Sequence, residues 1–106
     1  MKFKTSLIFG AGAFGTSIAS VLSNNFETVI ILVRSPEVYK SLKEQRENCQ
    51  YLPGITLPSN IIPALTWEEA ESIANNQIEL LVSGLPTNSI KAYCDENYER
   101  LKRHLV

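Results

Sequence analysis

The segment GAGAFGTSIASVL, residues 10–22, is the most informative part of the sequence for the fold. It opens with three glycines in the spacing GxGxxG. A short, mostly apolar run at residues 6–9 leads into it. Behind the glycines, apolar residues recur with the period of a helix at Phe14, Ile18, Val21 and Leu22. This pattern predicts a strand, a tight turn and a helix in succession.

A secretion signal is the alternative interpretation of the same stretch, since it follows the basic segment MKFK at residues 1–4. A signal needs an uninterrupted apolar run of about 7 to 15 residues and a cleavage site of small residues. Here the glycines and the hydroxyl side chains of Thr16, Ser17 and Ser20 interrupt the run. We therefore favour the turn. No later apolar run approaches the roughly 18 residues that a membrane-spanning helix requires.

The next elements continue the alternation of strand and helix. Residues 28–33 are apolar or β-branched throughout, which is typical of a strand buried on both faces of a parallel sheet. Ser35 and Pro36 then form a helix start, with Ser35 as N-cap, and the helix is predicted to end near residue 47. Residues 48–60 contain two prolines and a glycine and are predicted to be a loop, whose length suggests a function.

The second half repeats the order. Residues 61–65 are predicted to be a short edge strand, because Pro63 cannot donate to a ladder. Thr66 and Glu69 have the spacing of a capping box for a helix that ends near Ala74. A strand at residues 78–82 and a last helix from residue 87 follow. The fold class is therefore α/β, a doubly wound parallel sheet with strand order 3-2-1-4.

Composition narrows the class of protein without naming a function. The 106 residues are 44% apolar and 20% charged with a formal net charge of −1, which gives no indication of nucleic acid or of an anionic membrane as a partner. Cys49 and Cys94 lie far apart and His104 is the single histidine. A disulfide framework and a zinc site are therefore not expected, and a reducing cytoplasm is the expected compartment.

The glycines have the arrangement that binds a dinucleotide. Gly10 would permit the tight turn, Gly12 would leave room between backbone and pyrophosphate, and Gly15 would let the helix pack closely on the strand. The N-terminus of the helix would then face the phosphates with free N–H groups and a partial positive charge. An ordinary glycine-rich turn is the alternative.

Two further side chains are candidates for cofactor contact. Arg34 stands where an acidic residue would bind the ribose of NAD, so NADP is expected to be at least tolerated; a solvated surface charge is its alternative role. Phe14 would either line the cofactor or join the core. Packing or solvated roles are expected for the remaining candidates, which are Trp67, Glu68, Glu69, Glu71, Tyr93, Cys94 and His104.

The loop carries a family resemblance. Residues 47–60 read ENCQYLPGITLPSN, and this segment resembles the N-terminal domain of NAD(P)-dependent glycerol-3-phosphate dehydrogenases of the bacterial type. The resemblance extends to GAGAFGTS at residues 10–17, VRSPE at 33–37, TWEEA at 66–70 and LPTNSIKAY at 85–93. It therefore covers essentially the whole chain.

The resemblance implies reduction of dihydroxyacetone phosphate to sn-glycerol 3-phosphate with NADH or NADPH, for phospholipid synthesis, and a homodimer when the protein is full length. By position, Ala13 and Phe14 would contact the cofactor, Arg34 would lie beside the adenosine ribose, and Pro86 would lie near the nicotinamide. The segment at residues 83–85 departs from the family pattern of alanine and valine before that proline.

The resemblance also implies parts that these 106 residues do not contain. The catalytic lysine of the family follows a fifth strand, and a helical second domain binds the substrate. We therefore expect residues 1–106 to be an incomplete dinucleotide-binding domain with no catalytic residue of its own. Lys91 and Lys102 match no catalytic position and are interpreted as solvated charges. A stand-alone, non-catalytic nucleotide-binding module and a related two-domain dehydrogenase remain as alternatives.

Overall fold

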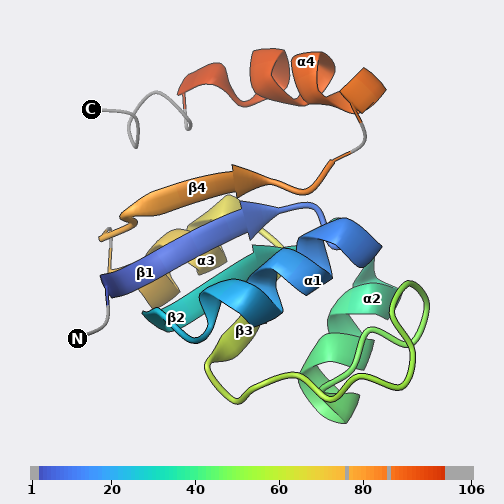
Figure 1. The fold of residues 1–106 in the computed structure, drawn as a ribbon. Helices are drawn as coiled ribbons and strands as arrows, with labels where there is room; N and C mark the ends of the chain where they lie inside the picture. The colour runs from blue at the N-terminus through green and yellow to red at the C-terminus, as the bar shows by residue number, and fades with distance from the viewer. Residues whose placement is uncertain (1–2, 76, 86, 100–106) are drawn as a thin grey trace.

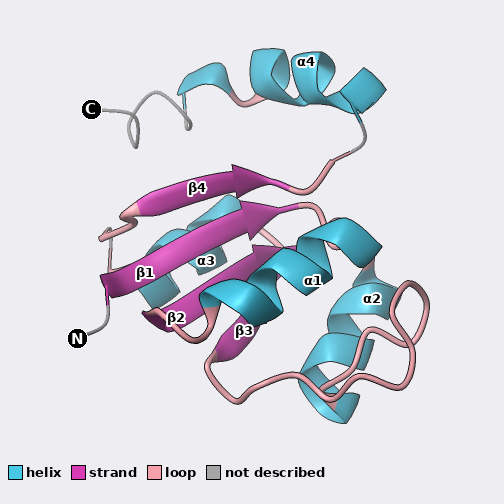
Figure 2. Ribbon diagram, in the orientation of Figure 1, coloured by secondary structure: helices cyan, strands magenta, loops and turns pink. Residues whose placement is uncertain are grey.

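The alternating pattern of the sequence forms a four-stranded parallel sheet between two layers of helices (Figures 1 and 2). The structure is a computed structural model that describes residues 3–75, 77–85 and 87–99. Its elements are β1 (Phe3–Phe9), α1 (Ala13–Leu22), β2 (Phe26–Leu32), α2 (Pro36–Lys40), the π-helical segment η1 (Ser41–Gln45), β3 (Ile61–Ala64), α3 (Trp67–Ala74), β4 (Leu80–Ser83) and α4 (Thr87–Glu96).

The strand order β3-β2-β1-β4 confirms the predicted order 3-2-1-4. Phe9 pairs with Leu32 of β2 and with Ser83 of β4, so the carboxyl ends of these three strands meet at one edge. Pro63 lies on β3, which is an edge strand as predicted.

Successive residues of the central strands enter opposite layers of the core. Ile8, Val29 and Ile31 pack against α1 and α2, which cover one face of the sheet. On the other face, Leu7 and Phe9 pack with residues of α3 and α4. Figure 1 shows α1 in front of the sheet and α3 behind it. Both faces of the sheet are thus buried, as the apolar run of β2 indicated.

Several predicted boundaries are shifted. The helix after Ser35 stays α-helical only to Lys40 and continues as η1 to Gln45, where Arg46 ends it with a left-handed φ of 55°. β4 begins at Leu80 instead of residue 78. Thr66 caps α3 as predicted by accepting from the Glu69 N–H, but the Glu69 carboxylate accepts from Leu65 N–H, one residue before the cap. Predictions for Pro86, Lys102 and His104 concern residues outside the described part.

Within the described residues, none of the helices combines the length and the apolar character needed to cross a bilayer.

Candidate functional site

The turn between β1 and α1 has the backbone geometry that its glycines predict. Gly10 adopts a φ of 107°, a backbone conformation that residues other than glycine rarely adopt. Its N–H donates to the Leu32 carbonyl at 3.0 Å. Gly12 is extended at the N-cap of α1, and no side chain caps this helix. No acidic residue lies in its first turn. The first N–H groups of α1 are therefore not capped by a side chain.

Gly12 and Gly15 differ in what surrounds them. A Cβ atom at Gly12 would meet nothing within 4 Å, so the protein itself does not require glycine there. A Cβ atom at Gly15 would overlap the carbonyl oxygen of Gly10. Gly15 is therefore needed for close packing of the helix on the turn, whereas the space at Gly12 is open to a ligand.

Gly84 is a second close-packing glycine, which was not predicted as a site residue. A Cβ atom at Gly84 would lie 2.7 Å from the Gly10 carbonyl oxygen and 2.9 Å from Gly15 Cα. The residue follows β4, which pairs directly with β1, so the two strand ends approach each other here. The departure at residues 83–85 from the family pattern thus places a small residue against the turn.

An open cavity of about 700 Å³ lies over the turn. It has the size of a small-molecule site and forms at the carboxyl ends of adjacent parallel strands, where ligands of doubly wound sheets bind. Its walls come from the turn, the end of β2, the long loop, the end of β4 and α4. The lining residues are Gly10, Ala11, Gly12, Ala13, Phe14, Val33, Arg34, Ser35, Val38, Tyr51, Ser83, Gly84, Leu85 and Ile90.

The predicted site residues take different positions around this cavity. Gly10, Gly12, Ala13, Phe14 and Arg34 line it, while Gly15 lies beneath the turn. Pro86 lies outside the described residues. Five of the six predicted site residues that the structure describes therefore line one cavity, and the sixth, Gly15, packs beneath it.

Two aromatic side chains border the cavity. Phe14 is 63% exposed, so it is not part of the core, and this rules out one of its two candidate roles. Tyr51 of the long loop is 48% exposed and also lines the cavity. Tyr51 was not predicted as a lining residue from the sequence, because only the folded loop brings it to the turn.

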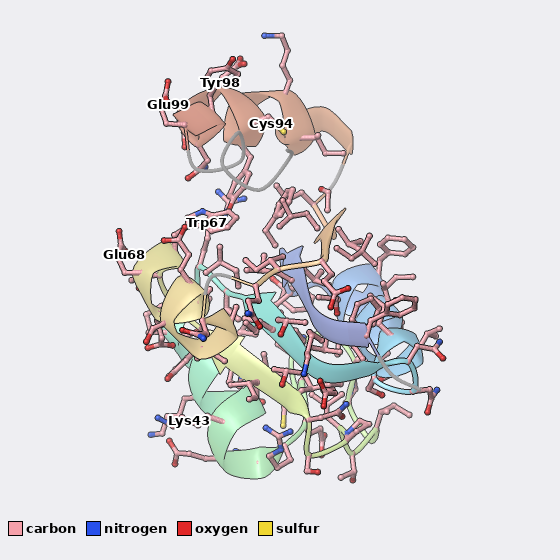
Figure 3. All side chains as sticks on the ribbon, turned by 90° about the vertical axis from the view of Figure 1, so that its left-hand side faces the viewer. Lys43, Trp67, Glu68, Cys94, Tyr98 and Glu99 are labelled. Atoms are coloured by element: carbon pink, nitrogen blue, oxygen red, sulfur yellow. The ribbon has the colours of Figure 1, made fainter. Side chains whose placement is uncertain are left out.

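The guanidinium group of Arg34 lies over a pair of stacked aromatic rings, those of Tyr93 and Phe9. Its guanidinium carbon lies 5.6 Å from the centre of the Tyr93 ring, and that ring stacks on Phe9 at 4.7 Å between centroids. The Tyr93 hydroxyl accepts from Trp67 Nε1 at 3.1 Å. Figure 3 shows Trp67 extending from α3 toward α4. Trp67 and Tyr93 are buried, which confirms their predicted packing role.

The long loop is tied to the rest of the chain by Arg46 and Asn48. The Arg46 guanidinium donates to the carbonyls of Pro58 at 2.6 Å and Ile61 at 2.7 Å. Asn48 is fully buried, and its Nδ2 donates to the Ala11 carbonyl at 2.7 Å and to the Thr16 hydroxyl at 2.9 Å. The loop therefore packs directly against the glycine turn.

The described lining of the cavity contains no carboxylate, lysine or histidine side chain. Among the described lining residues, Arg34 and Tyr51 are the titratable ones. Lys91 is exposed on α4, where the hydrogen bond from its ammonium group to Asp95 at 2.9 Å raises the lysine pKa. The described residues contain no group of three His, Cys, Asp or Glu side chains that could hold a metal ion.

The matching family model and two known proteins that resemble this chain belong to one enzyme family. A family model described as the N-terminus of NAD-dependent glycerol-3-phosphate dehydrogenase matches residues 6–106. A glycerol-3-phosphate dehydrogenase (NAD(P)+) from Bacillus mycoides is 43% identical over 88 residues, which are 83% of this chain and 24% of that protein. The enzyme of the same name from Listeria innocua is 33% identical over all 106 residues of this chain, which correspond to 30% of the length of that enzyme.

Solved structures with the same fold belong to enzymes of the same name. The glycerol-3-phosphate dehydrogenase of Saccharomyces cerevisiae superposes with a TM-score of 0.74 at 24% identity, over 92% of this chain and 30% of that one. The Plasmodium falciparum enzyme gives a TM-score of 0.75 at 24% identity, over 92% and 29%. At this identity the two structures support the fold. The chain spans less than a third of the length of each of these relatives.

Proposed function

Because the chain belongs to the family of NAD-dependent glycerol-3-phosphate dehydrogenases, whose N-terminal part it matches, we propose that it binds NADP or NAD over its glycine turn. It would be the cofactor-binding portion of an enzyme that interconverts dihydroxyacetone phosphate and sn-glycerol 3-phosphate. The observation that carries this proposal is the open space at Gly12, beside a helix N-terminus that no side chain caps.

The residues of the cavity suit a dinucleotide. The N–H groups at the start of α1, from Gly12 through Phe14, would hold the pyrophosphate, helped by the positive end of the helix dipole. Gly10 and Gly15 would shape the turn. Arg34 would bind the 2′-phosphate of NADP, and Phe14 would cover the cofactor with its exposed ring. Pro86 is proposed to lie near the nicotinamide.

In this proposal the chain contributes binding and orientation to catalysis. The bound nicotinamide would supply the hydride chemistry. The described lining residues would fix the cofactor at the carboxyl edge of the sheet and shield it with apolar side chains such as Val33 and Leu85. Since the described lining offers no carboxylate, lysine or histidine, we propose that the acid–base group of the reaction lies outside this described lining.

The biological setting follows from the same family. We propose a role in glycerophospholipid synthesis in the cytoplasm, and a homodimer for the full-length enzyme. Neither nucleic acid nor membrane is proposed as a partner.

A binding titration tests the cofactor proposal. NADPH and NADH are titrated separately into the folded 106-residue chain, with cofactor fluorescence or heat as the signal. Saturable binding of both is expected. A chain with a cooperative unfolding transition that binds neither dinucleotide would overturn the proposal.

The role of Arg34 has its own test. Arg34→Ala removes a charge-assisted contact to the 2′-phosphate, so the Kd for NADPH should rise about tenfold while that for NADH changes little. Lys4→Ala is a matched control, because it removes one positive charge at the start of β1, at the opposite edge of the sheet, where Lys4 pairs with Glu27. Equal loss of NADH and NADPH affinity in Arg34→Ala would contradict the assignment.

A stand-alone nucleotide-binding module is the second candidate, favoured by the lack of acid–base side chains among the described lining residues. Both candidate functions predict dinucleotide binding, but they differ in what the gene should encode after this segment. A reading frame that continues into a fifth strand, a lysine-containing segment and a helical domain would support the enzyme, and a frame without them would support the module.

A further inference from the structure

Asn48 is a fully buried polar residue at the point where the chain enters the long loop. All of its side-chain hydrogen-bonding atoms have partners. Nδ2 donates to the Ala11 carbonyl at 2.7 Å and to the Thr16 hydroxyl at 2.9 Å, and Oδ1 accepts from the Tyr51 N–H at 3.2 Å. The two Nδ2 partners lie more than 30 positions away in the sequence, so this buried amide joins two segments that share no backbone ladder.

The hydrogen bonds continue from Asn48 into the turn. The Thr16 hydroxyl, which accepts from Asn48, donates to the Gly12 carbonyl at 2.8 Å. Asn48 therefore holds the Ala11 carbonyl directly and the Gly12 carbonyl through Thr16. Both carbonyls belong to the peptide units of the glycine turn.

Fixing these carbonyls fixes the N–H groups that follow them. The Ala11 carbonyl shares a planar peptide unit with the Gly12 N–H, and the Gly12 carbonyl shares one with the Ala13 N–H. In a trans peptide the two groups point in opposite directions, so a carbonyl held toward Asn48 directs its N–H away from it. No cis peptide occurs among the described residues.

We propose that Asn48 is a positioning residue for dinucleotide binding: it holds the phosphate-binding turn in its binding geometry and ties the long loop to it. This inference rests on the proposed function. Through the Tyr51 N–H the same side chain also places a second wall of the cavity, since Tyr51 lines it. One buried amide thus orients both the turn and the loop that faces the cofactor.

Asn60 provides a matched control within the same loop. Its Nδ2 donates to the carbonyls of Ser23 at 2.9 Å and Phe26 at 3.0 Å, so it also joins the loop to a distant segment. These partners lie where β2 begins, at the edge of the sheet opposite the turn. Asn60→Ala should therefore cost stability without disturbing the turn.

The experiment compares four variants of the 106-residue chain by NADPH titration, with thermal unfolding used to express each Kd per folded molecule. Asn48→Ala and Thr16→Val should raise the Kd about tenfold, because each breaks the hydrogen-bonded path to the turn. Asn60→Ala should stay within about twofold of the original chain. Thr16→Ser keeps the hydroxyl and should largely restore the affinity that Thr16→Val loses.

The outcomes separate this inference from its premise. If the unsubstituted chain binds NADPH, and Asn48→Ala binds it as tightly as Asn60→Ala does, the positioning role is overturned. If Asn48→Ala does not fold, the Thr16 pair decides: equal affinities of Thr16→Val and Thr16→Ser would overturn it. Failure of the unsubstituted, folded chain to bind either NADPH or NADH would instead overturn the proposed function.

Discussion

The glycines that meet at the turn have different structural roles in this chain. Gly15 and Gly84 lie so close to Gly10 that a methyl group at either position would collide with its carbonyl oxygen. Gly12 has open space instead. The first pair therefore affects folding, while Gly12 should affect only a ligand that approaches the turn.

Substitution by alanine separates the two roles. Gly12→Ala should leave the free energy of unfolding nearly unchanged, since its φ of −77° suits any residue, but should raise the Kd for NADPH by about tenfold or more. Gly15→Ala should lower the free energy of unfolding by about 1–3 kcal/mol through overpacking. Urea unfolding and NADPH titration of both variants measure this. Large destabilisation by Gly12→Ala would contradict the interpretation.

Residue identity allowed part of the site to be predicted. The spacing GxGxxG and the position of Arg34 pointed to Gly10, Gly12 and Arg34, which line one cavity, and to Gly15, which packs beneath the turn. Gly84, Asn48 and Tyr51 were missed, because their importance arises from contacts with residues more than 30 positions away. Such contacts depend on which strand ends and loops meet in space, and no local pattern in one sequence records them.

Tyr93 makes the folded chain sensitive to alkaline pH. Burial is the largest influence on its phenol and raises the pKa above the ordinary value of 10.0, although the hydrogen bond with Trp67 and the charge of Arg34 oppose the shift. The unfolded chain therefore ionises this phenol first. Its contribution to stability is complete below about pH 10 and is lost as pH rises through the higher folded pKa.

Tyr93→Phe should remove this pH dependence. The difference in unfolding free energy between the original chain and Tyr93→Phe should be constant from about pH 8 to 9 and should shift against the original chain above about pH 10. Tyr98→Phe, which removes an exposed phenol, is the control. A difference that stays constant up to about pH 11 would refute the assignment.

Among the elements, the segment from η1 through the long loop is the least regular and the most specific to this fold. Arg46 ends η1 in a left-handed conformation and donates to two carbonyls near the far end of the loop. The sequence predicted a helix and then a loop, and both exist. The change to π-helical geometry was not predicted, since the apolar spacing in the sequence does not distinguish it from an α-helix, and the helix ends about two residues before the predicted position.

Two substitutions at Arg46 separate the stabilisation by its guanidinium hydrogen bonds from the cost of its left-handed backbone conformation. Arg46→Ala loses the guanidinium bonds and should reduce the free energy of unfolding by about 1.5–3 kcal/mol. Arg46→Gly loses the same bonds but tolerates the φ of 55°, so it should be more stable than Arg46→Ala by about 0.5–1 kcal/mol. Chemical denaturation of both variants measures the difference. The reverse order of stabilities would show that the left-handed backbone is not retained.

For the whole molecule, the sheet order could be predicted because alternating strands and helices with right-handed crossovers allow few arrangements. Strand ends were less predictable, since Ile78 is as suitable for a strand as Leu80 by composition. Within the described residues β4 pairs only with β1, so its other side is open. Leu80 is 38% exposed there. An open edge with exposed apolar residues favours marginal stability and association between chains.

Cofactor binding should stabilise the folded chain. A ligand at 100 times its Kd stabilises the folded state by about 2.7 kcal/mol, which corresponds to a rise in Tm of about 10–20 °C for a domain of this size. The original chain should show this rise with NADPH, and Gly12→Ala at the same NADPH concentration should show about half of it or less, because its Kd is about tenfold higher or more. A thermal melt followed by circular dichroism measures both. Equal shifts in the two chains would place the binding site elsewhere.

Amide chemical shifts can locate a nicotinamide dinucleotide bound over the glycine turn. NADPH is titrated into the ¹⁵N-labelled chain and the perturbed backbone N–H signals are assigned. We expect saturable shifts concentrated at residues 10–15, at residues 33–35 and at Tyr51. Saturable shifts confined to the β3 side of the sheet, or no shifts in a folded chain, would contradict binding over the turn.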